Sequence, residues 1–236
     1  MKKALRRISQ FVFRVFLSAW LLSLVWIILL KWMPVFFTPL MIIRSIEGHG
    51  WQYTYVSDEQ ISGNFYLAVV SSEDQKFLSH DGFDWESIKK AWDGNKKAKR
   101  IKGGSTISQQ TVKNVFLWPN RSWLRKGLET YFTFMIEFIW GKARILEVYS
   151  NIVELGPGVY GVEAASQKYF KKTASRITPS EAALLASVLP SPLKYSVSNP
   201  SAYIRKRQSW ITRQMNNLGG SKSFRKQLQP AETKAK

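Results

Sequence analysis

The chain has 236 residues and no cysteine, and it carries 35 Lys and Arg against 16 Asp and Glu, a formal net charge of +19. The absence of cysteine excludes disulfides and thiolate chemistry, and the length allows one membrane segment and one domain with its own core. A charge this positive predicts an anionic partner: nucleic acid, anionic lipid or a phosphorylated substrate.

The N-terminal region predicts a membrane anchor at residues 11–31, after a basic N-terminus at residues 1–10. Its apolar core, Phe11–Leu30, is interrupted only by Arg14. Twenty helical residues at 1.5 Å each cross a hydrocarbon layer of about 30 Å. The basic residues before it predict a cytoplasmic N-terminus, with the remainder of the chain outside. A cleavable signal peptide is the alternative, but no small-x-small cleavage site follows the apolar stretch.

Residues 32–64 are apolar at first and then rich in turns, with Pro34 and Pro39 interrupting any straight helix. They predict a membrane-proximal jaw or linker. Whether the apolar part lies along the membrane or packs beneath the following domain stays open at this point.

The stretch Ser71–Asp84 follows a buried apolar run, Tyr66–Val70. Glu73 and Asp74 therefore lie where a packed segment ends, and partial desolvation makes a carboxylate a better proton acceptor near neutral pH. The alternative is a helix N-terminus, with Ser72 as its cap and the two carboxylates favourably placed on the helix dipole.

A second polar cluster lies at Gly103–Asn114. Its two glycines allow close approach of the backbone to a ligand, and a serine or threonine after them can cap the next helix. Gln109 and Gln110 lie four and three residues before Lys113, so amides and a cation share one helix face. Such a face suits a sugar amide and a phosphate, although an ordinary surface helix has a similar pattern.

Further helices complete a mainly α pattern. Arg125 and Lys126 precede Glu129 by four and three residues within a long helix, Trp123–Trp140, which groups the three charges on one face. More helices are predicted at residues 142–152, 159–170, 179–189 and 200–218. Asp93–Lys102 is predicted to be either a phosphate-binding flap or a plain solvated loop. Residues 219–236 are predicted to be a basic disordered tail.

Four motifs occur in a fixed order: EDQKFLSHDGFD at 73–84, GGSTISQQTVKN at 103–114, RKGLE at 125–129 and KARILEVYSN at 142–151. Together they resemble the peptidoglycan glycosyltransferases of family 51, from about residue 65 to residue 215. A fifth family motif is weaker. It begins at Arg207, and Thr212 stands where the family has leucine, which puts the local helix packing in question.

The resemblance implies a mainly α, lysozyme-like glycosyltransferase domain at residues 65–218 with a small membrane-proximal jaw, preceded by one N-terminal transmembrane helix. Bifunctional members of the family carry a transpeptidase domain after this one, and none is expected here. The implied location is the bacterial cytoplasmic (inner) membrane, crossed once, with the N-terminus cytoplasmic and the catalytic domain periplasmic.

The implied reaction is polymerisation of lipid II into β-1,4 glycan strands, with inversion at MurNAc C1 and release of undecaprenyl pyrophosphate. Implied partners are lipid II, the growing glycan chain, membrane lipid and the inhibitor moenomycin, but not nucleic acid. Partnership with cell-division or other cell-wall synthesis proteins stays open. No cofactor is expected to be required, and a divalent cation, Mg or Mn, at the pyrophosphate stays open.

The resemblance also assigns roles. Glu73 is the expected base, and Glu129 the second catalytic carboxylate, which orients cations toward the pyrophosphate. Expected substrate-binding residues are Ser105, Gln109, Gln110, Lys113, Arg121, Arg125 and Lys126. Expected supporting residues are Asp74, Phe77, His80, Asp84, Asn114, Lys142 and Asn151.

Two other classes of protein remain as alternatives. A lysozyme-like lytic enzyme that cleaves glycan strands would also place two glutamates in an α-helical cleft, but hydrolysis needs a neutral acid to protonate the leaving oxygen. A membrane-tethered nucleic-acid-binding module would explain the charge and predicts salt-dependent DNA affinity. It leaves the order of the four motifs unexplained.

Overall fold

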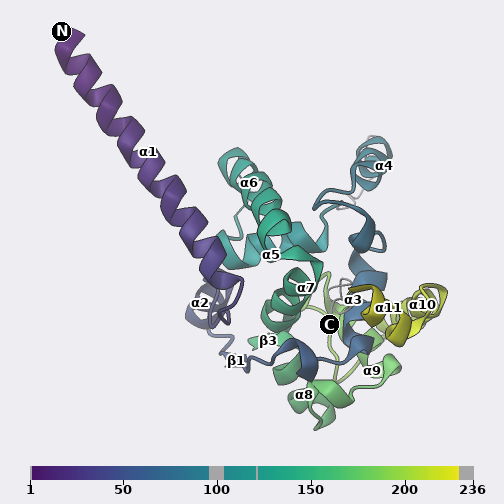
Figure 1. The fold of residues 1–236 in the computed structure, drawn as a ribbon. Helices are drawn as coiled ribbons and strands as arrows, with labels where there is room; N and C mark the ends of the chain where they lie inside the picture. The colour runs from purple at the N-terminus through teal and green to yellow at the C-terminus, as the bar shows by residue number, and fades with distance from the viewer. Residues whose placement is uncertain (1, 96–103, 121, 229–236) are drawn as a thin grey trace, which may run out of the picture. The chain divides into compact units, whose positions relative to one another are not determined.

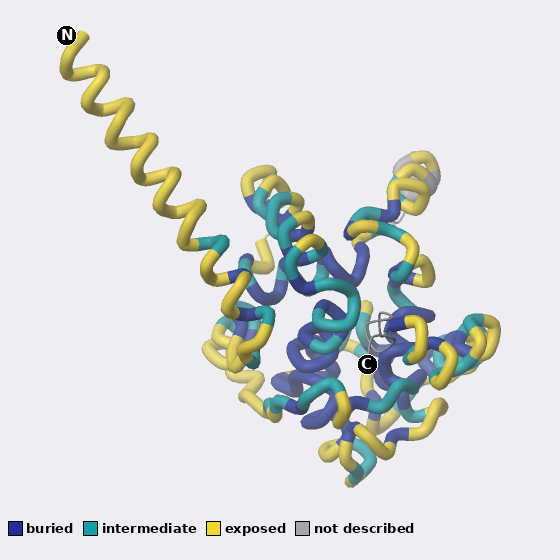
Figure 2. Tube along the Cα trace, viewed as in Figure 1, coloured by how far each residue is buried: buried dark blue, intermediate teal, exposed yellow. Residues whose placement is uncertain are grey.

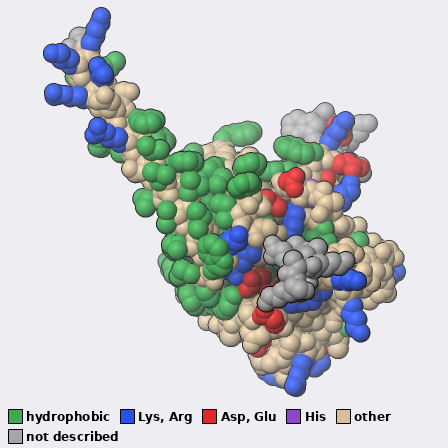
Figure 3. Space-filling view, viewed as in Figure 1, with side chains coloured by type: hydrophobic (Ala, Val, Ile, Leu, Met, Phe, Trp, Pro, Cys, Tyr) green, Lys and Arg blue, Asp and Glu red, His purple; other side chains and the backbone are tan. Residues whose placement is uncertain are grey.

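A computed structural model describes residues 2–95, 104–120 and 122–228. The chain forms two compact units, Met1–Pro34 and Val35–Lys236. The first unit is helix α1 (Lys2–Leu30), whose most apolar 18-residue window has a mean hydropathy of 2.2. Figure 3 shows Lys and Arg side chains at the N-terminal end of α1 and apolar ones along the rest. By length and composition, α1 is able to cross a membrane as a single-pass anchor.

The second unit consists mostly of helices, as the sequence predicts (Figure 1). They are α2 (Pro39–Ile46), α3 (Gly63–Glu73), α4 (Trp85–Asn95), α5 (Ile107–Phe116), α6 (Trp123–Ile139), α7 (Gly141–Ile152), α8 (Gly161–Phe170), α9 (Pro179–Val188), α10 (Ala202–Asn217) and α11 (Gly220–Leu228). Short 3-10 turns lie at Asp58–Gln60, Phe77–Ser79 and Ala174–Arg176. Strands β1 (Gln52–Tyr53), β2 (Glu154–Gly156) and β3 (Val159–Tyr160) form one small sheet, with β3 central, parallel to β1 and antiparallel to β2.

Helix α3 is the buried centre of one half of this unit, with α9, α10 and α11 packed around it. Every residue from Phe65 to Val70 is at most 2% exposed, and Figure 2 shows the helix in the buried colour. A helix that is apolar on all sides is stable only inside a core. Ser62 caps the start of α3, and Ser72 and Glu73 are the last residues of the helix. The alternative of a helix N-terminus at Ser72 is therefore wrong.

Helix α5 begins at a capping box. Thr106 Oγ1 accepts from the backbone N–H of Gln109 at 3.2 Å, and Gln109 Oε1 accepts from the backbone N–H of Thr106 at 3.0 Å. These reciprocal bonds satisfy two amides at the helix start and fix the direction of α5.

Of the predicted Asp93–Lys102 loop, residues 96–102 lie outside the described part of the chain.

The segment predicted as jaw or linker contributes directly to the fold. Helix α2 packs on α5 with Met41 fully buried, so part of the apolar segment packs against the domain, while Phe36, Phe37 and Ile42 stay 59%, 59% and 42% exposed. Further along, β1 pairs with β3, the Tyr55 hydroxyl donates to Glu147 at 2.6 Å, and the backbone N–H of Val56 donates to Asn151 at 3.0 Å. Residues from β1 onward are thus integrated into the same domain as the motifs.

The C-terminal region differs from the sequence prediction. Instead of a disordered tail from residue 219, the chain forms α11, and residues 229–236 lie outside the described ranges. Phe224 and Leu228 are 4% and 5% exposed, and Arg225 donates to the carboxylate of Asp58 at 2.8 Å. Two apolar residues in a basic segment give a weak sequence signal. The segment forms a helix because α3 offers these two side chains a surface to pack on.

The packing of α11 predicts that Phe224→Ala lowers the free energy of unfolding by about 3 kcal/mol, through lost apolar burial and a residual cavity. Lys222→Ala is the matched control on the exposed side of the same helix and should change stability by less than about 0.5 kcal/mol. Chemical denaturation of the two variants in detergent measures the difference. Equal midpoints would show that α11 contributes nothing to the domain.

Candidate active site

Glu73 is held by donors from three helices. Its side chain is 16% exposed at the C-terminal end of α3. Oε2 accepts from Gln110 Nε2 of α5 at 3.1 Å, while Oε1 accepts from Ser72 Oγ at 3.0 Å and lies 3.4 Å from the Arg207 guanidinium of α10. Both carboxylate oxygens are therefore oriented by neighbouring donors.

Gln110 is itself fixed from its other end. The hydroxyl of Tyr149, on α7, donates to Gln110 Oε1 at 3.2 Å. Tyr149 is fully buried, and burial, followed by the nearby charges of Glu73 and Asp74, raises its pKa well above the usual range for tyrosine. The Tyr149 hydroxyl therefore stays protonated and available as a donor.

The site residues predicted from the sequence motifs did not include Arg207. Arg207 is the first residue of the weak fifth motif, and its guanidinium also donates to Ser72 Oγ at 3.0 Å. Thr212, the departure in that motif, bonds within α10 to the carbonyl of Gln208 at 3.0 Å. The arginine that opens the motif was the signal that could have added Arg207 to the predicted residues.

A cavity of about 290 Å³ opens beside Glu73. It lies between the end of α3, the start of α4 and the residues just before α5. Its lining consists of Ser71, Ser72, Glu73, Asp74, Gln75, Lys76, Asp84, Ser87, Gly104, Ser105 and Thr106. A lining this polar suits hydroxyl and amide groups, such as those of a sugar.

Asp74 and His80 brace the loop that follows Glu73. Asp74 Oδ1 lies 2.9 Å from His80 Nε2, and Asp74 Oδ2 accepts from the backbone N–H of Ile107 at 3.0 Å. The Lys142 ammonium donates to the carbonyl of His80 at 2.5 Å and lies 4.6 Å from the ring centre of Phe77, which is fully buried. These contacts tie the loop to α5 and α7.

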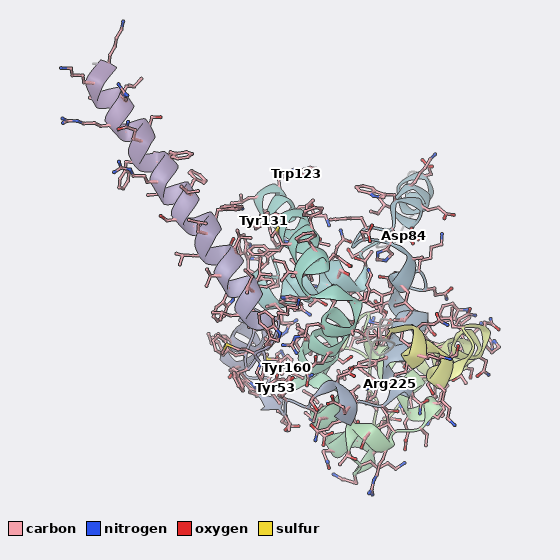
Figure 4. The ribbon with its side chains drawn as sticks, viewed as in Figure 1. Tyr53, Asp84, Trp123, Tyr131, Tyr160 and Arg225 are labelled. Carbon is pink, nitrogen blue, oxygen red and sulfur yellow. The ribbon has the colours of Figure 1, made fainter. Side chains whose placement is uncertain are left out.

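Asp84 lies where α4 begins (Figure 4). Its carboxylate accepts from the backbone N–H of Ser87 at 2.9 Å and from the Ser87 hydroxyl at 2.5 Å. Burial acts to raise the pKa of Asp84, but the two Ser87 bonds and nearby cations outweigh it, and the pKa is lowered. Asp84 thus contributes a fixed negative charge to the rim of the cavity beside Glu73.

Glu129 is the centre of a buried ion cluster on α6. It is 4% exposed, and its Oε2 accepts from the Arg125 guanidinium at 2.6 Å. Its Oε1 accepts from the ammonium of Lys126, whose side chain is 47% exposed. The i+3 and i+4 spacing in the sequence therefore places all three charges together, as predicted.

A second cavity, of about 640 Å³, lies over this cluster. Its lining consists of Ser105, Lys113, Pro119, Ser122, Trp123, Arg125, Lys126 and Glu129. Three cations and one carboxylate leave the lining positive, which suits an anion such as pyrophosphate. Ser105 lines this cavity and the one beside Glu73, so the two adjoin.

Other predicted site residues lie elsewhere. Gln109 is 4% exposed, lines neither cavity and completes the α5 capping box, so its expected contact with substrate is not supported. Asn151 is 1% exposed and bonds to both backbone polar groups of Val56. Asn114 lines a third cavity, of about 260 Å³, together with Gln110 and Lys113. Arg121 lies outside the described residues.

The third cavity also contains an acidic residue, Glu154, 3.6 Å from the Arg44 guanidinium. Burial raises the pKa of Glu154, although Arg44 opposes the shift. Within the described ranges, no group of three or more His, Asp and Glu side chains is arranged to hold a metal ion. Both oxygens of Glu129 accept from cations.

The outer face of α6 is apolar, although it is exposed. Leu124, Phe134 and Phe138 are 70%, 63% and 82% exposed and recur along one stripe of the helix. Trp123, at the outer end of the helix in Figure 4, is 94% exposed. The same helix thus presents charges to the second cavity and an apolar stripe to its surroundings.

The chain matches a known protein family over most of its length. Residues 41–216 match the family described as "Transglycosylase". A protein of Mannheimia succiniciproducens is 59% identical over 167 residues, 71% of this chain and 68% of that protein. Proteins of Haemophilus influenzae and Bacteroides thetaiotaomicron are 51% and 48% identical over 82% and 80% of this chain, covering 82% and 79% of their own lengths. All three are named "Biosynthetic peptidoglycan transglycosylase". The chain belongs to the transglycosylase family.

Proposed function

We propose that this protein is a peptidoglycan glycosyltransferase that polymerises lipid II into β-1,4 glycan strands. One observation carries the proposal: a carboxylate, Glu73, faces a polar cavity that adjoins a second cavity lined by Lys113, Arg125 and Lys126. A glycosyl transfer from a pyrophosphate needs these two environments side by side, a proton acceptor for the attacking hydroxyl and cations for the leaving group.

The chemistry follows from this division. Glu73 accepts the proton of the acceptor GlcNAc 4-hydroxyl as that oxygen forms a bond to MurNAc C1 of the donor. The bond from C1 to the pyrophosphate oxygen breaks, and undecaprenyl pyrophosphate leaves with the electron pair. Lys113, Arg125 and Lys126 stabilise the negative charge that develops there. Attack from the face opposite the leaving group inverts C1 from α to β.

The cation cluster favours transfer over hydrolysis of glycan strands. A lytic enzyme needs a carboxylic acid held neutral to protonate the leaving sugar oxygen. Both oxygens of Glu129 instead accept from cations, so neither is placed to donate a proton to a leaving sugar oxygen. A pyrophosphate leaves without a proton donor, so the arrangement around Glu129 suits it. No step of this mechanism uses a metal ion.

The exposed apolar stripe of α6 supports a membrane-bound substrate. Apolar side chains of this size are costly to expose to water and suit the boundary between headgroups and acyl chains. Lipid II carries a long polyprenyl chain, so a cation-lined cavity beside an apolar face matches its two ends. The location proposed is a single-pass protein of the bacterial cytoplasmic membrane, with the catalytic unit periplasmic.

The topology gives a direct prediction. A reporter fused after residue 236 should be active only outside the cytoplasm, because the basic residues at the N-terminal end of α1 hold that end of the chain inside. The mature protein should also retain its N-terminal segment, which mass spectrometry measures. A cytoplasmic C-terminus, or cleavage near Pro34, would contradict the proposed anchor.

The proposed function is tested with the purified full chain and lipid II. Polymer that is sensitive to lysozyme and whose formation is blocked by moenomycin is the expected product. The same preparation should release no fragments from preformed glycan strands. Release of such fragments without polymerisation would support the lytic alternative, and salt-dependent DNA binding without either activity would support the nucleic-acid alternative.

A further inference from the structure

We propose that Tyr149 and Gln110 form a positioning relay that holds the Glu73 carboxylate correctly aimed for proton abstraction. The inference rests on the proposed function, since it concerns how the base of that reaction is kept ready. Neither residue needs to touch the reacting atoms for this role.

The hydrogen bonds of the relay run in one direction, from Tyr149 through Gln110 to Glu73. An ionised carboxylate only accepts hydrogen bonds, so Gln110 must present its amide nitrogen to Glu73, at 3.1 Å. The carbonyl oxygen of the same amide then faces Tyr149, whose hydroxyl donates to it at 3.2 Å. An amide has nearly the same shape in both orientations, and only its hydrogen-bond partners decide between them. Tyr149 therefore keeps the Gln110 donor pointed at Glu73.

The surrounding fold makes the relay rigid. Tyr149 is fully buried in α7, so its hydroxyl depends on partners inside the protein. Gln110 lies one residue after the capping box that starts α5, and Asp74 holds that helix start through the N–H of Ile107. The three members of the relay thus come from α3, α5 and α7, elements whose relative positions are set by the core.

Other charged groups near Glu73 act on different atoms. Arg207 approaches Oε1 from α10, whereas the relay contacts Oε2. Lys76 and Asp84 line the same cavity with opposite charges, and Asp74 is occupied by His80 and by the N–H of Ile107. On the described residues, the relay supplies the hydrogen bond to Oε2, so its loss leaves that oxygen without this donor.

A hydrogen bond to the charged form of a carboxylate favours that form. Removing the Tyr149 hydroxyl frees the Gln110 amide to turn and weakens this preference. A Glu73 carboxylate that is no longer held in position lowers turnover. Because its charged form is also less favoured, a higher pH is needed to ionise it. The acid limb of the pH–rate profile should therefore move to higher pH, an effect that a merely structural role would not produce.

The test compares Tyr149→Phe, Gln110→Met and the double variant in the full chain, with lipid II as substrate. We expect Tyr149→Phe to lower kcat about 10- to 100-fold with little change in KM, the scale of a modest misplacement of a reacting group. Its acid limb should shift upward in pH. Gln110→Met should lose at least as much, and the double variant should equal Gln110→Met alone, because the two residues act in series.

Tyr66→Phe is the matched control. Tyr66 is equally buried and donates to Asp58 at 2.7 Å, away from the relay. This variant should be less stable yet keep the wild-type pH–rate profile. Tyr149→Phe behaving in the same way, or additive losses in the double variant, would overturn the relay. Should Tyr149→Phe fail to fold, the profile of Gln110→Met alone decides.

Failure of the relay is distinguishable from failure of the proposed function. Wild-type protein that makes no polymer, or a Glu73→Gln variant that polymerises normally, would contradict the function or its base. An inactive Glu73→Gln together with an unchanged profile of Tyr149→Phe would contradict the relay alone.

Discussion

Replacing Glu73 by glutamine should lower the rate of lipid II polymerisation by at least about 10²-fold, the usual contribution of a positioned general base. Glutamine keeps the size of the side chain and one acceptor oxygen, but it is scarcely basic. Donor binding should survive, because the adjoining cavity proposed for the leaving group is lined by Lys113, Arg125 and Lys126 and not by Glu73. Polymerisation rate and moenomycin affinity measure the two effects separately.

The stability of Glu73→Gln should change much less than its polymerisation rate. The glutamine amide places a donor near the donors of Gln110 or Arg207, so a loss of about 1 kcal/mol is expected. Glu59→Gln is the matched control: Glu59 is exposed in a 3-10 turn and lines neither active-site cavity. A Glu73→Gln protein that melts early but polymerises at the wild-type rate would remove Glu73 from the mechanism.

Replacing Glu129 by glutamine should also lower the rate of lipid II polymerisation by about 10²-fold. Unlike Glu73→Gln, this variant should also bind the donor site more weakly. The carboxylate anchors Arg125 and Lys126, and cations that are no longer held in place stabilise a developing negative charge less well. Moenomycin affinity should fall along with the rate, whereas Glu73→Gln leaves it unchanged. The two variants together separate the leaving-group cavity from the base.

Glu129→Gln should also cost about 2 kcal/mol of stability, because the Arg125 side chain is only 10% exposed and loses its charged partner. Glu181→Gln is the comparison, since Glu181, on α9, pairs with Lys172 and lines neither active-site cavity. Near-normal polymerisation and inhibitor affinity for Glu129→Gln, at unchanged stability, would reduce Glu129 to an ion pair without a role in the reaction.

Interactions within a few residues of chain were determined by the sequence alone. The spacing of Arg125, Lys126 and Glu129 places them on one turn of any helix, whatever packs around it. The cap that starts α5 and the apolar stretch of α1 are local in the same sense. The order of the four motifs identified the family, and the comparisons confirm it.

Local spacing could not say which members of a polar face meet the substrate. Gln109 and Gln110 are adjacent and equally polar, yet Gln109 completes a capping box while Gln110 reaches Glu73. The hundred-degree turn between neighbouring helical residues separates their directions, and only the position of α5 in the fold decides which direction is the active site. The start of α3 at Ser62 likewise decided that Glu73 ends a helix.

Contacts between distant parts of the chain were decided by the tertiary structure. Arg207 lies 134 residues after Glu73 in the chain, and Tyr149 lies 39 residues after Gln110. Helix α11 forms because its two apolar residues find the surface of α3. Such contacts depend on how buried helices pack, and packing is a property of the whole core that no short stretch of sequence contains.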